Sequence, residues 1–332
     1  MRTRILLFLS SIILVPLCTY FVILFARGYR LNWQRKQLSP TGLLVATSSP
    51  DGAQIHLNGQ LSSATNTTIN LPPATYKVEI KKDGFSPWTK TLRVEAEIVT
   101  RAAATLFPSV PSLKAITSSG AINPVLSPDG TKIVFTSGKK SYLLDLSESP
   151  LGLINRDARE ITSTSSAWKT PTKIDPLPTL PQTIQDILAT AAANLVWSPK
   201  ENKLLYTATA SASIPDDLIK PLPGSSTQAQ ARDLQAGQLY VYDLEEDRNF
   251  AVPPGVTWFP NSYHLLKTEK GKVTIMEYDG QNPTIVYAGP MENSFAFPYP
   301  SGKQLLILVN LRSPSEARQG EGVANLYAVS LR

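Results

Sequence analysis

The feature that most constrains the fold is a strand pattern that recurs four times in the last two thirds of the chain. In each copy a turn containing a proline is followed by a short apolar strand; these prolines are Pro128, Pro199, Pro260 and Pro300. One short copy cannot bury both faces of its own sheet, so the copies must stack on one another. Repeats of about 40 residues made of short strands are typical of propeller blades. The sequence therefore predicts a small β-propeller over residues 109–332.

Comparison of the strands in the first and last copies predicts how many blades the ring has. Each copy continues into a third strand, and three copies continue into an outer strand, but the fourth copy reaches Arg332 without one. Residues 113–117, just before the first copy, have the pattern of an outer strand. We therefore expect them to complete the last of four blades. A fifth blade inside residues 164–193 is the alternative.

Two insertions interrupt the copies, at residues 164–193 and 211–236. In the first, Ile184, Ile187, Leu188 and Ala191 have the spacing of a short amphipathic helix. The second is rich in Ser, Pro, Gln and Asp, which predicts a mobile loop. Long insertions are often functional; surface decoration, or a helix plugging a small ring, is the alternative.

Residues 42–108 show strand alternation and no helical periodicity. Asn58-Gly59 is a strong hairpin signal, and Tyr76, Val78 and Ile80 alternate with polar residues. A domain of about 65 residues buries little surface. We therefore expect a simple β-sandwich with one thin core.

The N-terminus contains a long apolar run. Residues 5–26 carry no charge, and as a helix they would extend over about 33 Å, enough for a hydrocarbon core of about 30 Å. The run ends Phe25-Ala26-Arg27, without the small-residue pattern of a cleavage site. It predicts a single transmembrane anchor between a short tail, residues 1–4, and a basic linker, residues 27–41; a buried core helix is the alternative.

Charge and cysteine content exclude several classes of protein. The net charge of +6 comes from six bases in residues 1–40, which contain no acid, and the remaining chain is neutral. Nucleic-acid binding needs basic residues gathered on the folded part, so we expect no nucleic-acid partner. The single cysteine, Cys18, forms no intrachain disulfide, and two histidines with one cysteine cannot build a Cys/His zinc cluster.

Two resemblances follow from these motifs. The order S-P-D-G-A-x-I-x-L-N-G, L-P-P-A-T-Y-x-V-E-I and K-x-G-F-x-P-W, over residues 43 to about 107, resembles a PEGA domain, with Ala74 where that family usually has glycine. This resemblance implies a small β-sandwich of envelope proteins with no catalytic role. The turn, strand and Y-x-x-D-L segments of residues 110–332 resemble the TolB-like (WD40-like) propeller repeat.

Few residues are candidates for chemistry, and each has a plain structural alternative. No hydrolase, metalloprotease or nucleotide motif surrounds His56 or His264, which we interpret as ordinary strand or surface histidines. The acidic clusters 216–217 and 245–247 lack the ligand spacing of a calcium loop, so a solvated face is expected. Trp197 and Trp258 occupy equivalent repeat positions and predict blade packing, whereas Trp88 and Trp168 are candidates for a surface.

The overall expectation is an all-β protein: an N-terminal transmembrane helix, a PEGA-like sandwich and a propeller of about four blades. We expect a non-catalytic binding or scaffolding module in the cell envelope of a bacterium, with no cofactor, no metal and no catalytic residue. Its partners would be the membrane, through residues 5–26, and an envelope protein or cell-wall component. Bases flank the apolar run on both sides, and by count they place the β domains in the cytoplasm; the PEGA resemblance favours an extracytoplasmic location. A hydrolase or lyase acting on envelope polymer or peptide, and a scaffold facing the cytoplasm, are the alternatives.

Overall fold

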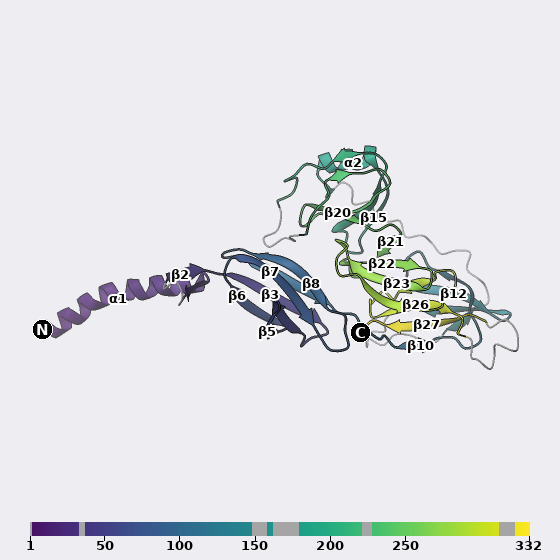
Figure 1. The fold of residues 1–332 in the computed structure, drawn as a ribbon, viewed down its shortest axis with the longest axis horizontal. Coiled ribbons are helices and arrows are strands. Elements are labelled where there is room, and N and C mark those ends of the chain that lie inside the picture. Colours follow the sequence, from purple (N-terminus) through teal and green to yellow (C-terminus); the bar gives the residue numbers. More distant parts are fainter. Residues whose placement is uncertain (1, 33–36, 148–157, 162–178, 221–227, 312–322) are drawn as a thin grey trace. The chain divides into compact units, whose positions relative to one another are not determined.

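The computed structural model describes residues 2–32, 37–147, 158–161, 179–220, 228–311 and 323–332. Nearly all of its secondary structure is β-strand (Figure 1). Two compact units divide the chain: Met1–Lys82 with Pro87–Leu106 and Leu222–Gln228, and Asp83–Ser86 with Phe107–Pro221 and Ala229–Arg332. Each unit is described by itself below.

The apolar N-terminal run folds as helix α1 (Arg2–Ala26), followed by a hairpin of β1 (Tyr29–Asn32) and β2 (Gln37–Pro40). Pro16 lies inside the helix, and the hydroxyls of Ser11 and Thr19 donate to carbonyls of the preceding turn. Within the described residues, no helix meets the length and hydropathy required to cross a bilayer. The prediction of a transmembrane anchor over residues 5–26 is therefore wrong.

Besides the β1–β2 hairpin, the described residues of the first unit form two larger sheets. One has the order β6 (Thr67–Leu71), β3 (Gly42–Ser49) and β9 (Val99–Thr105), with β3 and β9 parallel. The other has the order β5 (Gln60–Ala64), β4 (Gln54–Leu57), β7 (Ala74–Lys81) and β8 (Trp88–Val94). Buried and less buried residues alternate along β3 and β9, as a strand with one face on a core requires.

Two residues of this unit refine the sequence analysis. Ala74 begins β7 opposite Val94 and is not among the residues with positive φ, so this position does not require glycine. Trp88 is buried at the start of β8, which corrects the prediction that it lies at the surface.

The second unit contains four four-stranded antiparallel sheets. The first is β11 (Ile122–Leu126), β12 (Lys132–Ser137), β13 (Lys140–Asp145) and β14 (Arg159–Ile161). The second is β15 (Ala192–Trp197), β16 (Lys203–Ala208), β19 (Leu239–Asp243) and β20 (Arg248–Val252). The third is β21 (Val256–Trp258), β22 (His264–Glu269), β23 (Lys272–Glu277) and β24 (Thr284–Ala288). The fourth is β25 (Ala296–Pro298), β26 (Gln304–Val309), β27 (Asn325–Ser330) and β10 (Leu113–Ala115).

The fourth sheet is completed by the strand that precedes the first. β10 pairs with β27, with Leu113 opposite Val329, as the comparison of the first and last copies predicted. Thr117 adds a side-chain hydrogen bond of 3.0 Å to Asn325. The outer strand of the last sheet is therefore supplied from the start of the repeat region.

Shared hydrophobic clusters place the sheets in a row. One cluster joins the first and fourth sheets, another the fourth and third, and another the third and second. No cluster of the described residues joins the first sheet to the second, and these residues form no closed barrel. The expectation of a closed four-bladed ring is corrected accordingly.

The face of the second sheet that does not pack against the third sheet packs against α2 (Gln182–Ala191). Ile184, Leu188 and Ala191 are buried, which confirms the amphipathic helix expected from their spacing. The described ends of the second insertion also pack here, through β17 (Ala212–Ser213) and β18 (Asp233–Leu234). This part of the insertion is an ordered ladder, because Ile214 and Leu234 are buried, and the prediction of a mobile loop is wrong for it.

Candidate functional site

The four repeats share one turn geometry, which follows the first strand of each repeat. The second residue after the turn proline is left-handed in every copy: Gly130, Glu201, Ser262 and Gly302 have φ of 70°, 57°, 63° and 67°. The side chain just before that residue caps the turn in three copies: Asp129, Asn261 and Ser301 each accept a hydrogen bond from the backbone N–H two residues on. The shared turn therefore fixes where the second strand of each repeat, and its first side chain, begins.

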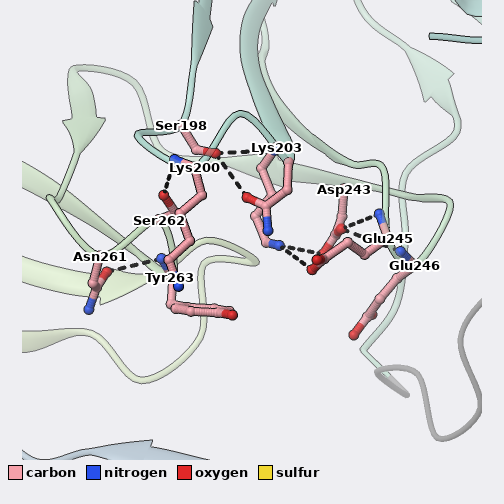
Figure 2. A network of polar contacts seen from close by, with 10 residues as sticks. Ser198, Lys200, Lys203, Asp243, Glu245, Glu246, Asn261, Ser262 and Tyr263 are labelled. Atoms are coloured by element: carbon pink, nitrogen blue, oxygen red, sulfur yellow. Dashed lines mark hydrogen bonds and ion pairs between the residues drawn. The ribbon is translucent and has the colours of Figure 1, made fainter. Parts of the chain in front are cut away.

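A buried ion pair lies directly after the turn of the second sheet (Figure 2). Lys203 Nζ is 3.1 Å from Asp243 Oδ2, and each side chain is 1% exposed. Glu245 Oε2 lies 3.5 Å from the same nitrogen, and the rings of Tyr278 and Tyr263 have centroids 4.6 and 5.4 Å from it. Buried charges need such partners, because a charge without them is costly away from water. We call these residues, with the others labelled in Figure 2, the Lys203 network.

The pair belongs to a position that recurs in all four sheets. The first residue of each second strand lies opposite a residue near the end of the third strand. These cross-strand pairs are Lys132 and Asp145, Lys203 and Asp243, His264 and Glu277, and Gln304 and Ser330. Three of the four thus place a basic side chain opposite an acidic one.

Contacts between turns join the second sheet to the third. Lys200 N–H donates to Ser262 Oγ at 2.8 Å, and Lys200 Nζ lies 5.0 Å from the centroid of the Tyr263 ring. Further along, the Trp258 indole N–H donates to the carbonyl of Val196 at 2.9 Å. These bonds confirm the packing role predicted for Trp258.

The network divides into a buried and an exposed part. Ser198 Oγ donates to Asn202 and accepts from the Lys203 N–H, and Ser262 Oγ accepts from Lys200, so both hydroxyls serve the turns. By contrast the Tyr263 residue is 45% exposed and the Glu245 side chain is 48% exposed. Solvent therefore meets the Tyr263 ring, with Lys200 Nζ beside it, and the Glu245 carboxylate.

Buried tyrosines surround this region. Burial raises the pKa of the Tyr278 hydroxyl well above its ordinary value, and the carboxylates of Asp243, Glu246 and Asp279 raise it further. Burial likewise raises the pKa of Tyr206 and Tyr242. All three hydroxyls are therefore neutral at physiological pH and act as hydrogen-bonding groups.

A second polar cluster fastens the insertion to the second sheet. The Arg232 guanidinium bonds the carboxylates of Asp216 and Asp247, at 2.8 and 3.3 Å, and the Pro215 carbonyl. Asp247 also accepts from the Tyr242 hydroxyl at 2.7 Å and from the Leu218 N–H at 2.9 Å. The expected solvated face at 245–247 is thus corrected for Asp247, which is buried and hydrogen-bonded, whereas Glu245 is exposed as expected.

The remaining sequence candidates have structural positions. His56 lies on β4 and its Nδ1 is buried without a hydrogen-bond partner, while His264 is buried between the rings of Phe107 and Phe259. Trp197 is buried in the cluster beneath α2. Trp168 lies outside the described residues. In the described part of the chain, no group of three or more His, Cys, Asp or Glu side chains is arranged to hold a metal ion.

The sequence analysis missed the Lys203 network. The sequence does contain a pattern that predicts it. In the first two repeats a lysine is the first residue of the second strand, and an aspartate is the last residue of the third strand. Antiparallel register brings these two positions together. Arg232 and Asp247 had no such signal, because the ladder of β17 and β18 is not part of the repeat.

Comparison with known proteins identifies one domain. Residues 41–109 match the model of the PEGA domain. No curated protein matches the chain.

Similar solved structures include propellers and enzymes. A eukaryotic initiation factor is 11% identical, with 74% of this chain and 46% of that chain covered and a TM-score of 0.27. TolB from Acinetobacter baumannii is 14% identical, with 88% and 54% covered and a TM-score of 0.22. The acylaminoacyl peptidase of Pyrococcus horikoshii is 12% identical, with 81% and 35% covered and a TM-score of 0.20. The chain spans about half the length of the first two, and at these TM-scores its function must be argued from its own residues.

Proposed function

We propose that the protein is a non-catalytic binding module whose contact surface is centred on Tyr263. The observation that carries the proposal is the division of the Lys203 network. Its buried charges and hydroxyls are engaged in turns and strand pairing, while Tyr263, which lies beside Lys200, and Glu245 are half exposed. An exposed tyrosine held in place by its neighbours supplies contact area at low entropic cost.

The composition of this surface favours a protein partner. Tyrosine is enriched among the residues that dominate binding energy, particularly where polar groups surround it. Here Lys200 lies over the ring and Glu245 belongs to the same network (Figure 2). Glu245, the half-exposed carboxylate of the Lys203 network, favours a partner segment carrying Arg or Lys.

Site-specific photocrosslinking tests the proposal. A photoreactive phenylalanine analogue at position 263 is expected to crosslink one protein in cells, and the same analogue at exposed Ile285, on β24, is the matched control. A Glu245→Lys variant should reduce the yield at position 263 at least five-fold if the partner segment is basic. Equal crosslinking at both positions would contradict the proposal.

Three expectations from the sequence stay predictions. They are the envelope location, the absence of catalysis and the absence of a cofactor. An assay for peptide hydrolysis by the purified chain would separate the binding module from the peptidase alternative.

A further inference from the structure

The orientation of the Asn261 side chain fixes the tautomer of a buried histidine. Asn261 Oδ1 accepts hydrogen bonds from the backbone N–H groups of Tyr263, at 3.0 Å, and His264, at 3.1 Å. A side-chain amide cannot reverse without losing both bonds, since its nitrogen is a donor only. The amide nitrogen therefore faces the imidazole, where Nδ2 lies 2.9 Å from His264 Nδ1.

This geometry assigns the proton of the imidazole. Because Asn261 Nδ2 donates, Nδ1 must be the acceptor, and a neutral imidazole then carries its proton on Nε2. The rings of Phe107 and Phe259 stand nearly perpendicular to the imidazole, with centroids 5.6 and 6.3 Å away. His264 is 5% exposed, so water has little access to Nδ1.

Protonation of Nδ1 would convert this acceptor into a donor. The Asn261 amide would then meet a second N–H, and the contact could be kept only by reversing the amide and breaking its two backbone bonds. Tyr263 lies between Asn261 and His264, so the broken turn is the one that presents its ring. The Lys200–Ser262 bond belongs to the same turn.

We propose that Asn261 and His264 form an acid-sensitive latch that holds the Tyr263 turn. Neutral His264 keeps the turn closed, and protonation in acid releases it and disorders the surface around Tyr263. The regulatory consequence rests on the proposed function of that surface, whereas the latch itself is a property of the turn.

The charged groups around His264 act on its titration in opposite directions. Glu277 lies opposite it on β23 and is itself buried, and its carboxylate favours the imidazolium. The Asn261 amide and burial against the two phenylalanine rings favour the neutral form. The aromatic rings from the Phe107 segment and the third-sheet turn carry no charge.

Nuclear magnetic resonance of the full chain tests the latch, since the chain has two histidines. A His56→Gln variant assigns the signals. At neutral pH the nitrogen shifts of His264 should show a protonated Nε2 and an unprotonated Nδ1. On acidification, the Asn261 amide and Tyr263 backbone signals should change with the same midpoint as His264. A protonated Nδ1 at neutral pH, or Asn261 signals that do not follow His264, would overturn the latch.

A matched variant reverses the expected effect. In Asn261→Asp, a carboxylate oxygen would replace the amide donor and accept a hydrogen bond from Nδ1–H, so the midpoint should rise by at least one pH unit, a ten-fold change in proton affinity. The first repeat has an aspartate at this turn position, where Asp129 Oδ1 accepts the Thr131 N–H, so the turn tolerates the change. An unchanged or lowered midpoint would refute the assignment. These signals are read without a partner, so failure of the latch and failure of the binding surface are distinguishable.

Discussion

Lys203 and Asp243 form an ion pair that is almost completely removed from water: Nζ lies 3.1 Å from Oδ2, and each side chain is 1% exposed. The Arg232–Asp247 pair is less deeply buried, with side chains 13% and 4% exposed. The pair bridges the two central strands of the second sheet, so its loss should destabilise the whole sheet.

Removing one partner should therefore destabilise the fold strongly. Lys203→Met leaves the Asp243 carboxylate buried without its cation, which should lower the free energy of unfolding by about 3–5 kcal/mol. Urea denaturation of the full chain measures this. The matched control is Lys140→Met, which removes the exposed Lys140–Glu160 bridge and should change the stability far less. Equal losses would show that burial of the pair is irrelevant.

Alkaline pH should weaken the fold through Tyr278. Its pKa is raised by burial, so above pH 10 the unfolded chain loses this proton while the folded chain retains it. Stability is then full below pH 10 and falls as the pH rises, by about 1.4 kcal/mol per pH unit for each such tyrosine. Denaturation at pH 9 to 11 should show a shallower decline for Tyr278→Phe. Parallel declines in the variant and the parent chain would contradict the prediction.

Acid titration of Asp129 should show that the hydrogen bonds in the turn of the first repeat lower its pKa. The Ser127 hydroxyl, 2.5 Å from Asp129 Oδ1, and the Thr131 N–H and hydroxyl lower the pKa of this carboxyl to about 2. Its contribution to stability is present above about pH 4 and is lost as the pH falls through about 2. Carboxyl carbon shifts in a Ser127→Ala variant should show the pKa of Asp129 moving back toward 3.8. An unchanged titration would mean that Ser127 is not the main cause.

Loss of Arg232 should release the second insertion without unfolding the sheet beneath it. Arg232→Ala removes the bonds to Asp216, Asp247 and Pro215. Hydrogen exchange of the β17–β18 ladder should then accelerate at least ten-fold, while exchange in β16 changes little. Arg232→Lys keeps the charge but not the planar fork, so it should give an intermediate effect.

Gly42 should be intolerant of even a methyl group. A Cβ at this position would lie 2.2 Å from the Glu95 carbonyl oxygen and 2.6 Å from a Val94 methyl. Gly42→Ala should therefore cost about 1–3 kcal/mol, because backbone must move. Gly52→Ala is a useful control, because nothing lies within 4 Å of its added Cβ and only its positive φ opposes the change. Thermal unfolding that ranks Gly52→Ala as the more damaging would contradict this argument.

The sequence was informative where local pattern and register decide the structure. The turn prolines and alternating apolar residues located the repeated strands, and the unpaired fourth copy led to the pairing of β10 with β27. The 3.6-residue spacing of Ile184, Leu188 and Ala191 located α2.

Where contacts come from elsewhere in the chain, pattern was insufficient. Asp247 was interpreted as solvated because nothing nearby shows that Arg232 and Tyr242 reach it. Trp88 was placed at the surface because its burial depends on how the sheets meet.

The pairing of β10 with β27 also ties the fourth sheet to the order of synthesis. The Leu326 N–H donates to the Thr117 hydroxyl across 209 residues of sequence. A ribosome therefore delivers the acceptor long before the donor. Until β27 emerges, the nascent chain must carry β10 without its partner strand, so the fourth sheet can be completed only after the strands of the other three have been synthesised.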